Sequence, residues 1–152
     1  MNAAQAHLLL NHIPVLVHLT GIVVLAVGLL LKSRDVRNVG AWLIVAGALG
    51  AIPVYLTGEP AESVVKNYPD VSVLLVEDHQ KSALISLVLL EFAGFSALLL
   101  NLASWRSKPI AARGAVWCLL LAVTLLAFGT IAWTAHLGGL IRHEEIRKSD
   151  RF

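Results

Sequence analysis

Histidine is the residue type in this chain best suited to chemistry, because a neutral imidazole can bind a metal ion or transfer a proton near neutral pH. The chain has six: His7, His12, His18, His79, His136 and His143. The spacing of His12 and His18 places them about 120° apart around a helix, so they cannot bind one ion together. A shared centre therefore needs histidines from different helices.

Carboxylates form a second set of candidate groups. Glu59 and Glu62 follow one another closely near the middle of the chain, and Glu145 lies beside His143. Imidazole combined with carboxylate is a ligand set that suits zinc or iron. Glu91 differs from these because it is the one formally charged side chain within the long apolar runs, where a carboxyl must be protonated or hydrogen-bonded. It is a candidate proton relay or, with equal weight, a hydrogen-bonding group of the core or of an oligomer contact.

Four long apolar runs must position these groups. At about 1.5 Å per residue, each run is long enough to cross the ~30 Å hydrocarbon layer as a helix. With 57% apolar and only 14% charged residues, the composition excludes an ordinary soluble domain, and no basic stretch points to nucleic acid. We predict one all-α domain over residues 1–152, an integral membrane four-helix up-and-down bundle. Its expected helices cover residues 8–31, 39–57, 82–103 and 114–137.

The connections predict which polar groups share a membrane face. A polar loop, 58–81, joins the second helix to the third, and a tail, 138–152, follows the fourth. Both termini and this loop must lie on one side of a four-span chain, and all six histidines lie toward that side. Each side of the membrane has six positive residues, so their number alone does not decide the orientation. The side with the histidines is expected outside the cytoplasm because the first helix, which usually dominates, has three positive residues after it and none before it, and because the six positive residues of the first and third loops lie within a total of 17 residues. Four tryptophans near helix ends are expected to be interface anchors: Trp42, Trp105, Trp117 and Trp133.

Depth distinguishes the histidines from one another. His12 lies about 6 Å and His18 about 15 Å into the first helix, where a polar ring must pair with or bind something. On position alone, His12 could instead hydrogen-bond a backbone group freed by Pro14, and His18 a neighbouring helix. His79 could be an ordinary residue at a helix start. The two outermost rings, His7 and His143, are most simply solvated.

Four short motifs stand out: Asn11-His12-Ile13-Pro14, Tyr55-Leu56-Thr57-Gly58-Glu59-Pro60-Ala61-Glu62, Glu77-Asp78-His79 and Gly138-Gly139-Leu140-Ile141-Arg142-His143-Glu144-Glu145. Across nearly the whole chain they resemble a group of uncharacterised bacterial four-span membrane proteins akin to the DUF2231 domain of unknown function. The resemblance implies the four-helix architecture, a bacterial inner (plasma) membrane location, and an emphasis on His12, His79 and His143. It implies no activity.

We expect a b-type cytochrome-like electron-transfer protein with a histidine-ligated haem near the extracytoplasmic face. The first and third helices are diagonal in an up-and-down bundle, so His12 and His79 are the preferred axial pair. A quinol or a redox protein would exchange electrons with the haem. Further candidate groups are His136 or His143 for a second haem or a hydrogen bond, His18 as another ligand, and Arg142 or Lys81 for the propionates.

Two alternatives stay open. One is a zinc or iron site formed by His12, Glu59, Glu62, His79, His143 and Glu145. The other is a non-catalytic accessory subunit of a larger membrane complex or a homo-oligomer, in which the polar cluster is a docking surface. The sequence contains no nucleophile elbow, phosphate-binding loop or dinucleotide fingerprint, and it leaves open whether the protein is an enzyme.

Overall fold

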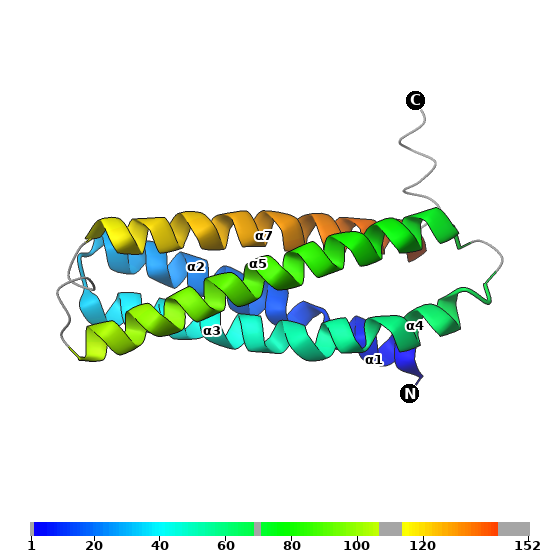
Figure 1. The fold of residues 1–152 in the computed structure, drawn as a ribbon, viewed down its shortest axis with the longest axis horizontal. Helices are drawn as coiled ribbons and strands as arrows, with labels where there is room; N and C mark the ends of the chain where they lie inside the picture. The colour runs from blue at the N-terminus through cyan, green and yellow to red at the C-terminus, as the bar shows by residue number, and fades with distance from the viewer. Residues whose placement is uncertain (1, 69–70, 107–113, 143–152) are drawn as a thin grey trace, which may run out of the picture.

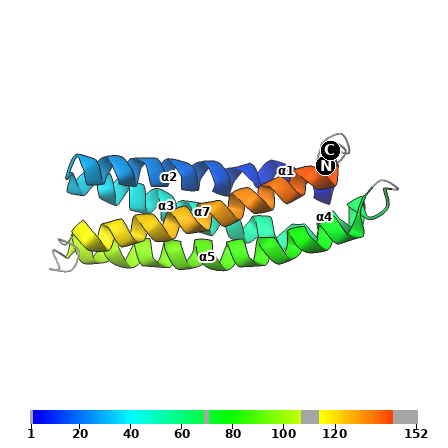
Figure 2. The same cartoon turned by 90° about the horizontal axis from the view of Figure 1, so that it is seen from above.

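A computed structural model describes residues 2–68, 71–106 and 114–142, and every regular element in these ranges is an α-helix. The elements are α1 (Ala3–Leu10), α2 (His12–Leu30), α3 (Arg34–Leu56), α4 (Gly58–Val65), α5 (Val73–Trp105) and α7 (Gly114–Arg142). α1 continues into α2 and α3 into α4, so the helices form four long rods that lie side by side (Figures 1 and 2).

The rods form an up-and-down bundle. α2 packs on α3 and α7, and α5 packs on the same two helices, so α2 and α5 are diagonal. The four rods are long and apolar enough to cross a membrane. Large apolar side chains stay exposed along them, including Leu16, Phe95 and Leu126, and such a surface suits lipid rather than water. The predicted fold class, an all-α membrane four-helix bundle, is confirmed.

The contact between α2 and α3 depends on glycine. A Cβ at Gly40 would lie 2.5 Å from the backbone nitrogen of Leu25, and a Cβ at Gly28 would lie 2.5 Å from that of Arg37. No side chain fits in such gaps, so the two backbones touch directly, as small residues allow in membrane helices. We call this contact the glycine seam; two further glycines belong to it, Gly21 and Gly47.

Trp117 is part of the core, and the expectation that it anchors the interface was wrong. It is only 1% exposed, and the guanidinium carbon of Arg37 lies 5.4 Å from its ring centroid, which is a cation–π contact. The position of a residue near a helix end predicts how deep its side chain lies in the membrane, but not which side of the helix it is on. The other three tryptophans are exposed, as interface anchors must be: Trp42, Trp105 and Trp133.

The helices extend beyond the apolar runs used to predict them. α5 begins at Val73 rather than at residue 82, and α4 occupies the start of the expected loop 58–81. The Ser72 side chain accepts a hydrogen bond from the backbone nitrogen of Leu75 and so caps α5. α7 continues through the expected start of the tail to Arg142. Charged residues end an apolar run but not a helix, because a helix that leaves the membrane can expose them to water.

Candidate functional site

The end of the bundle that holds most of the histidines is built by α1, α4, the first turns of α5 and the last turns of α7 (Figure 1). We call it the histidine end. Helix α1 begins with a reciprocal cap, in which Gln5 N donates to Asn2 Oδ1 at 2.9 Å and Asn2 N donates to Gln5 Oε1 at 3.0 Å. It ends before Asn11, because the Pro14 ring disfavours an uninterrupted helix through the residue four positions earlier.

This short helix carries His7 to the end of α3. Nδ1 of His7 lies 3.1 Å from the Val54 carbonyl oxygen and 3.1 Å from Thr57 Oγ1. A carbonyl oxygen can only accept, so this contact requires the proton on Nδ1. In the neutral ring the lone pair is then on Nε2, which is the form that binds metals.

His79 is held in the same way on the facing helix. Its Nδ1 donates to the Thr134 carbonyl oxygen of α7 at 3.0 Å, which again leaves the lone pair on Nε2. Gly138 makes room for this ring, because a Cβ there would lie 3.2 Å from His79 Cε1. The backbone of α7 thus fixes both the tautomer and the position of the imidazole.

The two rings meet. The ring centroids of His7 and His79 are 6.5 Å apart and their planes are 85° apart. Two imidazoles that bind one ion through Nε2 at about 2.0–2.1 Å have centroids roughly 5 to 6.5 Å apart, the larger value when they lie on opposite sides of the ion. The observed separation is at the upper end of this range, so the two rings could hold one metal ion between them.

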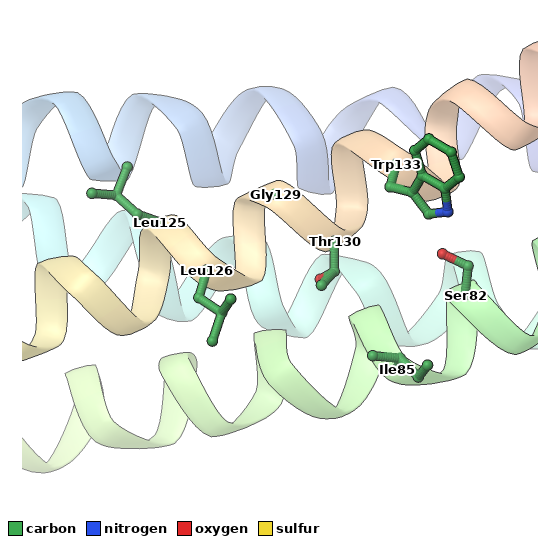
Figure 3. A pocket seen from close by; sticks show the side chains of 7 residues that line it. All are labelled: Ser82, Ile85, Leu125, Leu126, Gly129, Thr130 and Trp133. Atoms are coloured by element: carbon green, nitrogen blue, oxygen red, sulfur yellow. The ribbon is translucent and has the colours of Figure 1, made fainter.

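A ladder of hydroxyl groups lies one turn further into the bundle. Thr134 Oγ1 lies 2.6 Å from Ser82 Oγ and 2.9 Å from Ser86 Oγ, so it joins α7 to α5. Ser82 also lines a groove of about 460 Å³ between these helices, which Thr130 and Gly129 extend (Figure 3). Thr134 is therefore shared: its hydroxyl contacts a groove residue and its carbonyl holds His79.

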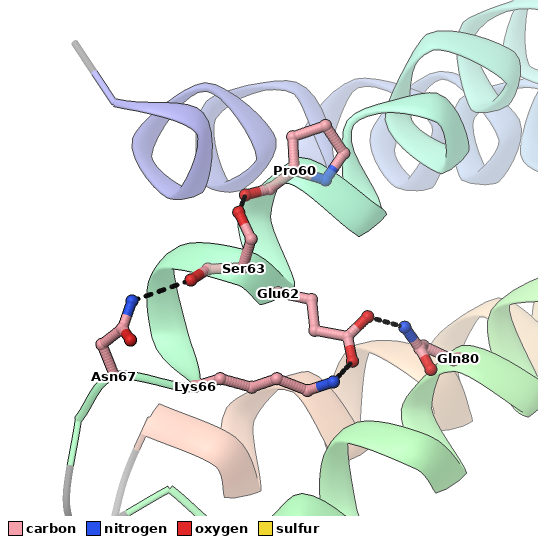
Figure 4. A network of polar contacts seen from close by, with 6 residues as sticks. All are labelled: Pro60, Glu62, Ser63, Lys66, Asn67 and Gln80. Carbon is pink, nitrogen blue, oxygen red and sulfur yellow. Dashed lines mark hydrogen bonds and ion pairs between the residues drawn. The ribbon is translucent and has the colours of Figure 1, made fainter.

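Glu62 belongs to a polar network on the outer side of the same end. It accepts a hydrogen bond from Gln80 of α5 and pairs with Lys66 one turn along (Figure 4). Its carboxylate oxygens are therefore already occupied by donors. Glu59, the neighbouring candidate, is exposed.

The other predicted histidines do not join this pair. His12 is exposed, and its Nδ1 lies 2.9 Å from the Leu8 carbonyl oxygen of the preceding turn. His136 is also exposed and its ring lies 5.5 Å from that of Trp133. His18 is fully buried deeper in the bundle. Its Nε2 lies 3.3 Å from the Thr124 carbonyl oxygen, and its Nδ1 has no hydrogen-bond partner among the described residues.

Glu91 is half-buried on α5, and its Oε1 is buried without a hydrogen-bond partner in the described part of the chain. Lys81 is largely exposed and lies 3.9 Å from Asp78. His143 and Glu145 lie outside the described residues, and so does the side chain of Arg142. Within the ranges the structure covers, no three His, Cys, Asp or Glu side chains form a metal-binding group.

His7 is the site residue that sequence reasoning missed. The apolar run predicts a first helix over residues 8–31, which leaves His7 outside it. The signal that could have found it is the Asn2 and Gln5 pair, because a residue that caps a helix followed by Gln at this spacing predicts a helix start. That start places His7 on the helix. Comparison of the chain with family models, with curated proteins and with solved structures finds no match.

Proposed function

We propose that this protein is a b-type cytochrome-like electron carrier of the membrane, with haem iron bound between His7 and His79. The observation that carries the proposal is the paired geometry of these rings: centroids 6.5 Å apart, with each Nδ1 bonded to a backbone carbonyl. Bundles bind cofactors between side chains of facing helices in this way. His79 stays in the axial pair expected from the sequence, and His7 takes the place of His12.

The number of ligands favours haem iron over a bare ion. A haem macrocycle supplies four nitrogens, so two histidines complete the coordination of the iron. A bare zinc ion needs three or four protein ligands. Glu62 is one of the predicted carboxylate ligands, but Lys66 and Gln80 already bind its carboxylate oxygens. The zinc or iron site is therefore our second candidate.

A bound haem would supply one-electron chemistry, and the chain would supply its position and access to it. The backbone carbonyls of Val54 and Thr134 orient the two ligands. We propose that a lipid-soluble quinol binds in the groove between α5 and α7, which is mainly apolar apart from the Ser82 and Thr130 hydroxyls, and gives up its two electrons one at a time, with its two protons released to water. Thr134 links that groove to the site, because it contacts Ser82 and holds His79.

We further propose that the histidine end faces outward from a bacterial inner membrane, as the distribution of positive charge favours. The likeness to the DUF2231 group stays a proposal of the same kind. A reporter fused after Phe152 and another inserted near Tyr68 should both be active only outside the cytoplasm. Cytoplasmic activity at both positions would reverse the orientation, and activity on opposite sides would contradict the four-span fold.

The experiment that tests the function is the absorption spectrum of the purified protein, oxidised and reduced, with metal analysis of the same sample. We expect a low-spin spectrum that sharpens on reduction, with iron and haem in stoichiometric amounts. A colourless protein with stoichiometric zinc or iron would support the second candidate. A colourless, metal-free protein would overturn both and favour the accessory-subunit alternative.

A further inference from the structure

The opposite end of the bundle contains a second polar site, which the proposed haem centre does not use. A cavity of about 430 Å³ lies where α3 begins and α5 ends, and its polar lining consists of Arg34, Asp35, Asn38 and Asn101. Trp42 and Trp105 also line it and are exposed, as expected of side chains at a membrane surface. We call it the asparagine cavity.

Two buried acceptors of this cavity lack donors. Asn101 is only 4% exposed; its Nδ2 donates to the Asn38 carbonyl oxygen at 3.3 Å, but its Oδ1 has no partner among the described residues. Asn38 Oδ1 is likewise buried and without a partner there. A buried acceptor left unpaired costs about 1–3 kcal/mol, so a ligand that brings N–H groups is favoured.

The charges of the cavity favour a zwitterionic ligand. Among the described residues that line it, one cation, Arg34, and one anion, Asp35, leave no net formal charge. Arg34 is anchored by Ser104, since its Nε donates to Ser104 Oγ at 3.0 Å and its Nη2 donates to the Ser104 carbonyl oxygen. The start of α3 favours negative charge and the end of α5 favours positive charge, because helix dipoles have these signs.

We propose that the asparagine cavity binds the headgroup of phosphatidylethanolamine from the bilayer. The primary ammonium offers three N–H donors for the Oδ1 atoms of Asn38 and Asn101 and the carboxylate of Asp35. The phosphate lies toward Arg34 and the N-terminus of α3. The exposed tryptophans place the cavity at the headgroup level, which is why the source is a membrane lipid rather than a soluble amine.

The test is a lipid series on the purified full-length protein, with retained lipid measured by native mass spectrometry and stability by thermal shift. The series keeps the acyl chains constant and replaces the ammonium hydrogens one by one with methyl groups. Its members are phosphatidylethanolamine, its monomethyl and dimethyl forms, and phosphatidylcholine. We expect affinity to fall along this series, by roughly fivefold for each hydrogen bond lost. Equal retention of phosphatidylethanolamine and phosphatidylcholine would overturn the proposal.

Two further arms separate the rival ligands. Phosphatidylglycerol tests a simple anion site, and preference for it over phosphatidylethanolamine would contradict the assignment. Soluble phosphoethanolamine shares the headgroup chemistry without the acyl chains. We expect it to compete poorly, and competition equal to that of the lipid would overturn the bilayer as the source.

A variant then locates the site. Asn101→Leu removes the amide donor and the amide acceptor while keeping the number of side-chain heavy atoms, and it should abolish the preference for phosphatidylethanolamine over phosphatidylcholine. Asn67→Leu is the matched control, because Asn67 is exposed at the histidine end and its side chain donates to the Ser63 carbonyl four residues earlier, far from the asparagine cavity. If Asn101→Leu does not fold, the lipid series on the unaltered protein decides alone. An unchanged preference in folded Asn101→Leu would contradict the site.

Discussion

The glycine seam between α2 and α3 and the contact between α5 and α7 are built from similar apolar helices, yet they differ in what they leave open. In the glycine seam every gap is closed, since a Cβ at Gly40 would lie 2.5 Å from a backbone nitrogen. Between α5 and α7, a Cβ at Gly129 would meet nothing within 4 Å, and a groove of about 460 Å³ lies there. Glycine therefore allows direct backbone contact in one helix pair and leaves an open groove in the other.

The difference assigns separate roles to the two helix pairs. The glycine seam holds the bundle together through backbone contact, which small residues permit in a membrane. The α5 and α7 pair is joined instead by the hydroxyl ladder of Ser82, Ser86 and Thr134, and the Thr134 backbone carbonyl holds His79 beside it. Stability should therefore depend on the first pair and ligand access on the second.

Substitution of a seam glycine should have the largest effect. Gly40→Ala forces a Cβ onto the backbone of Leu25, and overpacking of this kind should cost about 3 kcal/mol. Gly129→Ala has open space and should be neutral or stabilise by roughly 0.5–1 kcal/mol, because alanine favours the helix. Unfolding in detergent, followed by circular dichroism, measures both. Equal effects of the two variants would remove the distinction between the helix pairs.

Filling the groove should affect function without affecting the fold. Gly129→Leu places a side chain in the space between Ser82 and Leu125 and should lower the rate of quinol oxidation by about tenfold, equivalent to about 1.4 kcal/mol. The absorption spectrum should not change. Gly114→Leu is the control, because a Cβ there also meets nothing within 4 Å but lies at the first residue of α7, about four turns from Gly129 and outside the groove. Full activity of Gly129→Leu would exclude the groove as the quinol site.

Loss of the ladder hydroxyl should have a smaller effect. Thr134→Val leaves Ser82 and Ser86 without their shared partner and should cost about 1 kcal/mol, the usual value for polar contacts between membrane helices. Thr130→Val is the matched control, because the Thr130 hydroxyl bonds only the Ala127 carbonyl of its own helix. Thermal denaturation of the two variants compares them directly. A control that loses as much stability as Thr134→Val would show that the ladder adds nothing between helices.

The smallest effect is expected at Glu91. Glu91→Gln keeps the shape of a side chain whose Oε1 has no partner within the described residues, so stability should change by no more than about 0.5 kcal/mol. The haem spectrum should be unchanged. Slower quinol oxidation with an intact spectrum would assign a proton-relay role to Glu91, whereas unchanged turnover would leave it a structural residue. A loss of several kcal/mol would contradict both roles.

The architecture could be predicted because it depends on properties that the sequence displays directly. Long uncharged runs predict spanning helices, and short connections predict antiparallel neighbours, so the diagonal placement of α2 and α5 follows. Helix ends were less predictable, since α5 and α7 continue into polar segments.

The sequence predicts less well which side of each helix faces the core of the bundle. The burial of Trp117 and the exposure of His12 and His136 depend on how each rod is rotated in the bundle. In α2 and α3 the observed rotation brings the backbones of Leu25 and Gly40 together, a contact between helices that neither helix alone predicts. The meeting of His7 and His79 likewise depends on contacts between helices, because α1 packs on α4 and His7 contacts the end of α3.

The central claim is that His7 and His79 bind the haem iron, and the most direct test compares His7→Ala with His12→Ala. The absorption spectrum of each purified variant, oxidised and reduced, is measured beside that of His79→Ala. We expect the low-spin spectrum to be lost in His7→Ala and His79→Ala and kept in His12→Ala, whose ring is exposed and bonded to its own helix. A spectrum that survives in His7→Ala and disappears in His12→Ala would contradict the account.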